Sequence, residues 1–184
     1  MNFSSPDELK RLIRQLPDYP VKDVIFLDIT PLFRDRDAMR YAIRTQAEAF
    51  AGRGVDAVAG VEARGFIVGA PLAYELGVGF VPVRKPGKLP WRKRRVDYKL
   101  EYGEEAVEVH EDAFSGGQRV LLVDDLLATG GTAAAAASLI EGLGAKVAAI
   151  SFVVELAHLE GRKKLAGYDV HSLVRYEKKG GRLV

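Results

Sequence analysis

Hydrophobic and polar positions are arranged along the chain in blocks that predict strands and helices in turn. Short runs of apolar residues predict buried strands at residues 56–61, 80–83, 119–123, 146–154 and 170–174. Apolar residues at helical spacing predict helices at residues 35–50, 65–76, 132–143 and 159–165. Apolar strands that alternate with helices are typical of a parallel sheet covered on both faces. The pattern therefore predicts one α/β domain over residues 1–184.

Two segments depart from this rhythm. Near the N-terminus, Ser5 and Pro6 predict the start of a short helix with Ser5 as its N-cap, and an apolar stripe that extends to Leu16 continues it. A brief strand is expected near residues 24–27. Residues 84–109 begin with a basic stretch broken by Pro and Gly and then alternate like a small antiparallel ribbon. We interpret this second segment as a flexible flap over the site.

Composition and charge exclude several classes of protein. Lys and Arg number 27 against 25 Asp and Glu, so the net charge of +2 gives no general attraction to nucleic acid or to an anionic membrane. The absence of cysteine excludes disulfides, thiolate metal sites and cysteine nucleophiles. No apolar run approaches the ~18 residues that a membrane span requires. A cytoplasmic protein with neither nucleic-acid nor membrane partners is the expectation.

The most informative segment runs from Val120 to Thr132. A hydrophobic strand leads into two carboxylates, Asp124 and Asp125, and then into a loop of small residues that opens an Ala-rich helix. The glycines let successive N–H groups point inward, the threonine hydroxyls add donors, and the helix N-terminus adds partial positive charge, which together favour phosphate. Two carboxylates at a buried strand end need partners, because desolvating them is costly. Sugar hydroxyls, a cation or a lysine would satisfy them.

This string resembles the signature of the type I phosphoribosyltransferases. It is neither a Walker A loop, since no Lys follows the glycines, nor a dinucleotide-binding G-x-G-x-x-G motif. The resemblance implies that Asp124 and Asp125 hold the ribose 2′- and 3′-hydroxyls of phosphoribosyl pyrophosphate. It assigns the 5′-phosphate to the loop residues Ala128, Thr129, Gly130, Gly131 and Thr132.

Further segments resemble the branch of this family that acts on adenine. Glu62-Ala63-Arg64-Gly65-Phe66 resembles its pyrophosphate-binding turn, in which Arg64 can grip pyrophosphate bidentately and the Gly65 amide adds a donor. Residues 84–90 and 98–103 resemble the two strands of its flap. The resemblance places Arg84, Lys85 and Lys88 in the pyrophosphate region and makes Glu101 the catalytic residue.

The candidate residues for binding the base lie mainly in the N-terminal segment. Residues 25–31 resemble the family's N-terminal hood, here residues 1–34, where a Phe stacks on adenine and neighbouring backbone groups pair with its edge. The residues so assigned to the base are Ile25, Phe26, Leu27 and Leu126. Leu27 stands where some members of the family carry Arg, which is tolerable if this position acts only through its backbone.

The resemblance implies a type I phosphoribosyltransferase fold, with a central parallel sheet flanked by helices, a small hood (residues 1–34) and an antiparallel flap (residues 84–109). It implies transfer of phosphoribose from phosphoribosyl pyrophosphate to adenine, giving AMP and pyrophosphate in purine salvage by a homodimer. Mg²⁺ is expected through substrate and water, with no direct protein ligand. Two alternatives are another purine base as acceptor and a regulator that senses phosphoribosyl pyrophosphate and contacts nucleic acid through Arg92–Arg95. Trp91–Arg95 receives no catalytic role, and the histidines His110, His158 and His171 are interpreted as structural or surface residues.

Overall fold

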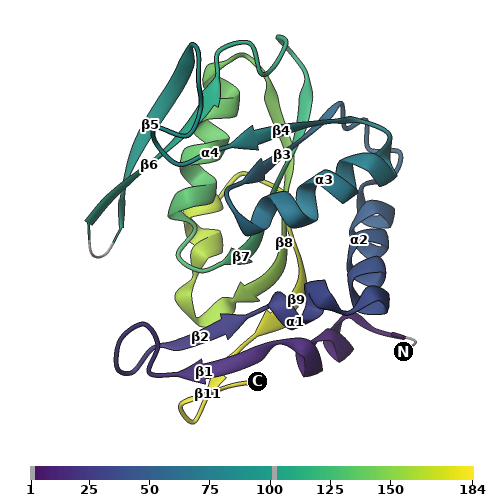
Figure 1. Ribbon diagram of the computed structural model, residues 1–184, viewed down its shortest axis with the longest axis vertical. Coiled ribbons are helices and arrows are strands. Elements are labelled where there is room, and N and C mark those ends of the chain that lie inside the picture. Colours follow the sequence, from purple (N-terminus) through teal and green to yellow (C-terminus); the bar gives the residue numbers. More distant parts are fainter. Residues whose placement is uncertain (1–2, 101–102) are drawn as a thin grey trace.

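The computed structural model describes residues 3–100 and 103–184, and a five-stranded parallel sheet is its centre (Figure 1). The strands lie side by side in the order β4-β3-β7-β8-β9, and every neighbouring pair is parallel. Their bounds are β3 Ala57–Val61, β4 Gly79–Val83, β7 Arg119–Leu127, β8 Lys146–Leu156 and β9 Val170–Tyr176. The predicted parallel sheet is thus confirmed.

Alternate residues of the central strands pack on opposite faces of the sheet. Leu121 and Val123 belong to the core that lies against α2 (Arg36–Phe50) and α3 (Arg64–Leu76). Leu122 belongs to the second core, which lies against α4 (Gly131–Gly142). Figure 1 shows α4 on one side of the sheet and α2 with α3 on the other. Burial on both faces explains why these strands are continuously apolar.

The helix boundaries follow from local chemistry. The Asp35 carboxylate accepts hydrogen bonds from the N–H groups of Asp37 (3.0 Å) and Ala38 (2.9 Å), which caps the start of α2. Gly77 ends α3 with φ of 70°, a left-handed conformation that glycine adopts without steric cost. The short helix expected at residues 159–165 is present in part, as 3₁₀ helix. The structure has two 3₁₀ turns there, η2 (Ala157–Leu159) and η3 (Gly161–Leu165).

The N-terminal hood is a separate small layer. It contains η1 (Pro6–Leu12), β1 (Arg14–Pro17), β2 (Ile25–Asp28) and α1 (Thr30–Arg34), and β1 pairs with β2 antiparallel, outside the main sheet. Leu9 and Leu32 are fully buried in the α2 side of the core, so the hood is anchored by apolar packing. In Figure 1 the hood lies next to the C-terminal strand β11 (Arg182–Leu183), which pairs with β10 (Lys178–Lys179).

Two details of the expected first helix are wrong. Ser5 occupies the N-cap position of η1 but its side chain makes no capping hydrogen bond, and Ser4 donates to the Glu8 carboxylate instead. Leu16 is not part of a helical stripe, because it lies in β1 and is 39% exposed. A seven-residue 3₁₀ helix is too short for the stripe to continue that far.

The predicted antiparallel ribbon of residues 84–109 is present as the hairpin of β5 (Lys93–Leu100) and β6 (Gly103–His110). The hairpin begins at Lys93, so most of the basic segment Trp91–Arg95, which received no catalytic role, lies in β5. Glu108 stabilises the end of the hairpin at Lys93. This carboxylate is 3% exposed, lies 2.8 Å from Lys93 Nζ and accepts a 3.1 Å hydrogen bond from the Gly87 N–H.

None of the helices within the described ranges is long and apolar enough to cross a membrane.

Candidate active site

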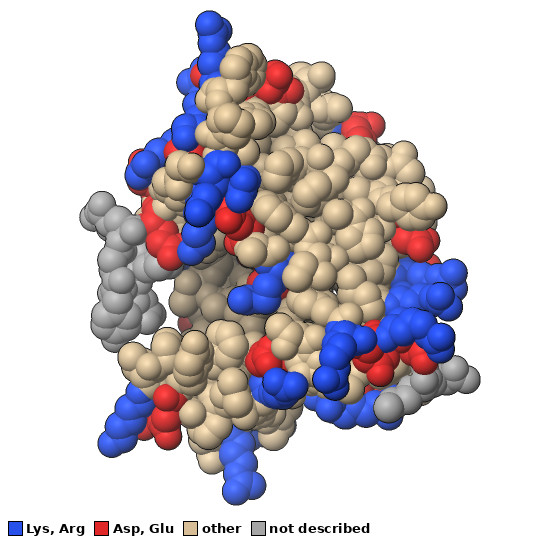
Figure 2. All heavy atoms as spheres, in the orientation of Figure 1, with Lys and Arg blue, Asp and Glu red and all other residues tan. Residues whose placement is uncertain are grey.

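A cavity of about 450 Å³ opens where β3, β4 and β7 end and the hairpin β5–β6 approaches. Figure 2 shows the surface hollowed between the hood and the rest of the molecule. Carboxyl ends of parallel strands are where such sheets bind ligands. The lining residues are Val61, Glu62, Ala63, Arg64, Val83, Arg84, Lys85, Tyr98, Glu105, Val107, Asp124, Asp125, Leu126, Ala128 and Thr132.

The two adjacent aspartates of this cavity, Asp124 and Asp125, lie inside a strand, whereas the sequence pattern ended the strand at Val123. β7 continues to Leu127 because Asp124 and Leu127 still pair with β8. Successive side chains of a strand alternate in direction, so the two acids have different surroundings. Asp125 is 7% exposed, whereas Asp124 is half-buried and accepts a 2.8 Å hydrogen bond from the Asp125 N–H.

Arg64 supplies the counter-charge for Asp125. Its Nε lies 2.5 Å from Asp125 Oδ2, and it reaches this position because β3 and β7 are parallel neighbours whose ends meet. Gly65 lets the start of α3 come close to β7. A Cβ at position 65 would lie 3.0 Å from Asp124 Oδ1 and 3.0 Å from the Val123 carbonyl oxygen, so a side chain there would require its neighbours to shift by a few tenths of an ångström.

Burial raises the pKa of Asp124 well above its usual range, and the neighbouring charge of Asp125 raises it further. The arrangement therefore favours a ligand that stabilises the charged form of the pair. Hydroxyl groups that donate hydrogen bonds would do so, as would a cation. The cavity combines this acceptor pair with basic side chains around its rim, which suits a molecule that carries both a sugar and anionic groups.

The loop after β7 forms an adjoining cavity of about 220 Å³. Thr129, Gly130, Gly131 and Thr132 all line it, and α4, a 12-residue helix, begins at Gly131. The first turn of α4 contains no acidic residue, so its free N–H groups and partial positive charge are available to an anion. Residues 128–132, which the sequence analysis assigned to a phosphate, thus line this cavity at the start of α4.

The hairpin reaches this loop through Tyr98. The Tyr98 hydroxyl lies 3.1 Å from Thr132 Oγ1 and donates a 2.7 Å hydrogen bond to Glu105. Burial raises the pKa of Tyr98 to about 12, so the hydroxyl remains a neutral donor at physiological pH. Hydrogen bonding from Tyr98 lowers the pKa of Glu105, which therefore stays ionised. These contacts join the flap to the phosphate loop.

The basic rim of the cavity is organised by Glu62. Arg84 donates to both Glu62 oxygens, at 3.2 and 3.3 Å, and the Lys85 N–H donates at 2.9 Å. Burial opposes ionisation of Glu62, but these donors outweigh it and lower its pKa. The side chain of Lys85 also lies 3.3 Å from Glu105. Arg84 and Lys85, two of the basic residues that the sequence analysis predicted, thus line the cavity.

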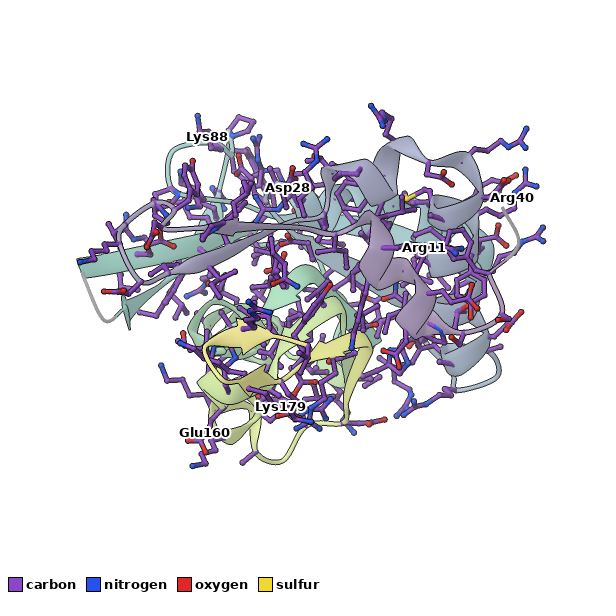
Figure 3. The ribbon with its side chains drawn as sticks, turned by 90° about the horizontal axis from the view of Figure 1, so that it is seen from below. Arg11, Asp28, Arg40, Lys88, Glu160 and Lys179 are labelled. Carbon is purple, nitrogen blue, oxygen red and sulfur yellow. The ribbon has the colours of Figure 1, made fainter. Side chains whose placement is uncertain are left out.

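Lys88 is not brought to the cavity with them. Its side chain is exposed on the loop before β5, as Figure 3 shows, and it is absent from the lining. Its carbonyl oxygen instead accepts a 2.9 Å hydrogen bond from Arg84. In the described structure this residue positions Arg84 through its backbone.

The residues assigned to the base divide into two groups. Leu126 lines both cavities beside the acids. Phe26, Ile25 and Leu27 lie in β2 of the hood, where the Phe26 ring meets the Tyr19 ring edge-on at 5.2 Å. The Leu27 side chain is 4% exposed and packs in the core, so only its backbone is available, as the sequence argument required.

The residue expected to be catalytic, Glu101, lies outside the described residues. Three polar lining residues escaped the sequence analysis as functional candidates: Glu62, Tyr98 and Glu105. Tyr98 and Glu105 are directly opposite each other in the hairpin, which could be found only from the strand register. Glu62 belongs to the turn at residues 62–66. Its partner Arg84 directly follows the neighbouring strand β4, and only the structure brings the two together.

Comparison with known proteins agrees with this geometry. Residues 34–178 match the model of the phosphoribosyl transferase domain. The adenine phosphoribosyltransferase of Methylococcus capsulatus is 58% identical over 92% of this chain and 99% of its own length.

Solved structures agree too. The adenine phosphoribosyltransferase of Thermoanaerobacter pseudethanolicus superposes with a TM-score of 0.90 at 55% identity, covering 93% of this chain and 99% of that one. The enzyme of Saccharomyces cerevisiae, crystallised with an iminoaltritol bisphosphate and adenine, has a TM-score of 0.86 at 41% identity, covering 91% and 97%. This chain therefore belongs to the phosphoribosyltransferase family, within its adenine phosphoribosyltransferases.

Proposed function

We propose that this protein transfers phosphoribose from phosphoribosyl pyrophosphate to adenine, yielding AMP and pyrophosphate, as a step of purine salvage in the cytoplasm. The observation that carries the proposal is the cavity in which Asp124 and Asp125 lie between the phosphate loop and the basic rim at Arg64, Arg84 and Lys85. A sugar with a 5′-phosphate and a 1′-pyrophosphate matches these three regions in chemistry. Family membership supports the acceptor base.

The residues of the cavity account for catalysis by position and charge. Departure of pyrophosphate leaves positive charge at C1′, so the reaction needs the sugar held in line and the leaving group neutralised. The acid pair fixes the ribose hydroxyls, the loop before α4 fixes the 5′-phosphate, and Arg64 with Arg84 meets the pyrophosphate. Tyr98, which bridges the hairpin to Thr132, limits access of water to C1′.

Mg²⁺ fits this site as an ion held mainly by substrate and water. Within residues 3–100 and 103–184, no group of three or more His, Asp or Glu side chains is placed to hold a metal. Phosphate oxygens, ribose hydroxyls and water would complete the shell of Mg²⁺, and Asp124 and Asp125 would act on the ion through the ribose hydroxyls and water. Bound there, Mg²⁺ supplies positive charge to the leaving pyrophosphate.

The basic hairpin gives the regulator alternative little support. Arg94 lies 3.5 Å from Glu111, Arg95 lies 2.5 Å from Asp97, and Lys93 is paired with Glu108. These neighbouring carboxylates offset much of the positive charge that a nucleic-acid surface would need.

We propose a homodimer that forms through the outer face of α3. Ile67 is 45% and Tyr74 85% exposed, and their spacing of seven residues places them on one side of this helix. Figure 2 shows a broad surface without charged side chains over α3 and β4. Contiguous exposed apolar surface of this kind marks protein interfaces. A second copy seated here would lie next to Arg64, the first residue of α3.

We expect a strong preference for adenine in a panel of purine bases assayed with phosphoribosyl pyrophosphate and Mg²⁺. Backbone groups of β2 that pair with the 6-amino edge would be left unpaired by a 6-oxo base, and such a loss costs on the order of 10⁴-fold in specificity. Product formation measured for adenine, hypoxanthine, guanine and xanthine tests this. Equal turnover with hypoxanthine or guanine would overturn the assignment of the base.

Replacing both acids, Asp124→Asn with Asp125→Asn, is expected to weaken binding of phosphoribosyl pyrophosphate and nearly abolish turnover, because the charged acceptors for the ribose hydroxyls are lost. Steady-state kinetics and calorimetric binding measure the effect, and circular dichroism checks that the fold survives. The control is Asp112→Asn, which removes an exposed carboxylate away from the cavity. Normal kinetics in the double variant would mean that the ribose is held elsewhere.

Glu101→Gln tests the proposed acceptor of the purine proton. Adenine loses its imidazole proton as N9 bonds to C1′, so removing the basic group should lower kcat by roughly 10²–10⁴ with a smaller change in KM for phosphoribosyl pyrophosphate. Single-turnover measurements separate chemistry from product release. Glu111→Gln, an exposed residue just after the hairpin, is the matched control. A chemical step as fast as that of the unmodified protein would remove Glu101 from catalysis.

For the dimer, sedimentation velocity of the unmodified protein should give a mass of two chains, and Tyr74→Asp with Ile67→Asp should give one chain, because charge on this face cannot be buried without a partner. A fully active monomer at assay concentration contradicts the proposal.

A further inference from the structure

The phosphate loop rests on the backbone of a segment that the reaction does not touch. Gly161, the first residue of η3, is buried under Ala128 and Gly130. A Cβ at position 161 would overlap the carbonyl oxygen of Ala128 and lie 2.8 Å from Leu127 Cδ1. Conversely, a Cβ at position 130 would lie 2.5 Å from the Gly161 carbonyl oxygen. Each of the two glycines is thus required by the backbone of the other segment.

An ion pair holds η3 in this position. Arg162 donates through Nε to Glu155 Oε1 (2.8 Å) and through Nη2 to Glu155 Oε2 (2.7 Å). Its Nη1 donates to the Val170 carbonyl oxygen at 2.9 Å, which ties η3 to β9 as well. A two-pronged pair of this kind fixes direction as well as distance. Leu165, at the other end of η3, is 1% exposed and packs in the core beside α4.

The pair is placed beside the loop itself. Glu155 is 3% exposed and lies opposite Leu127, the last residue of β7 before the loop. Burial opposes its ionisation, but the bonds from Arg162 outweigh this and lower the pKa of Glu155. Glu160, which precedes Gly161, has φ of 53°, and Figure 3 shows its side chain directed away from the body of the molecule. The sharp turn there brings the backbone of residue 161, and no side chain, against the loop.

We propose that Gly161 and the Glu155–Arg162 pair are positioning residues for the 5′-phosphate. They support the Ala128–Thr132 loop on the side where Gly161 contacts Ala128 and Gly130. This contact fixes the position of the loop and thereby the direction of the N–H groups that bind the phosphate. None of the three touches substrate. This inference rests on the proposed function, because that function assigns the loop to the 5′-phosphate.

Calorimetric binding of AMP and of adenosine tests the proposal, because the two ligands differ only in the 5′-phosphate. Gly161→Ala forces the Ala128 backbone to move, and its φ is not in the region that only glycine favours, so the effect arises from the contact. We expect the Kd for AMP to rise roughly 10- to 100-fold, as misplacement by about 1 Å does, while the Kd for adenosine changes less than about twofold. KM for phosphoribosyl pyrophosphate should rise in parallel, with KM for adenine unchanged.

Gly116→Ala is the matched control, since nothing lies within 4 Å of a Cβ at that position. Arg162→Lys keeps the charge and loses the two-pronged geometry, and it should show the same selective loss for AMP in smaller measure. Thermal unfolding of each variant separates a positioning role from a purely structural one, which would lower Tm without changing the ratio of AMP to adenosine affinity. Gly161→Ala with an unchanged ratio would overturn the inference. Failure of the proposed function would appear differently, as an unmodified protein that forms no AMP.

Discussion

Asp124 and Asp125 lie at the end of a strand in which Val120, Leu121, Leu122 and Val123 are fully buried, so ionising both of them there is costly. The energetic cost of that position organises the surrounding structure. Arg64, the first residue of α3, pairs with Asp125, and Gly65 keeps close the contact between the start of α3 and Asp124, since a Cβ there would lie 3.0 Å from Asp124 Oδ1. The protein leaves chiefly Asp124 incompletely paired, so a ligand can supply the hydrogen bonds that this carboxylate lacks.

The parallel sheet makes this concentration of chemistry possible. Strands β3, β4 and β7 all end at one edge, so turns far apart in sequence contribute an acid pair, an arginine turn and a basic rim to a single cavity. The hairpin β5–β6 then closes over that edge from outside the sheet, and Tyr98 connects it to Thr132. The acid pair, the loop before α4 and the basic rim are therefore connected through a few hydrogen bonds.

The sequence was most informative where local patterns determine structure. Continuous apolar strands and helical spacing predicted the sheet and the helices α2 and α3, and the string from Val120 to Thr132 predicted that two acids and a loop of small residues follow one another at the end of a buried strand. The pattern failed where tertiary contacts decide. β7 runs through the acids because Asp124, Leu126 and Leu127 still pair with β8, and the 3₁₀ segment η3 is tied to β8 by the pairing of Arg162 with Glu155. No spacing in the sequence predicts the contact between Gly130 and Gly161.

The central claim is that the acid pair recognises the ribose hydroxyls, and a comparison of AMP with its 2′,3′-dideoxy analogue tests it most directly. Calorimetry should show that the unmodified protein binds AMP more tightly by at least about tenfold, because charge-assisted hydrogen bonds contribute on the order of 1.5–3 kcal/mol. In the Asp124→Asn, Asp125→Asn variant this difference should largely disappear. A variant that still distinguishes the two nucleotides as well as the unmodified protein does would contradict the account.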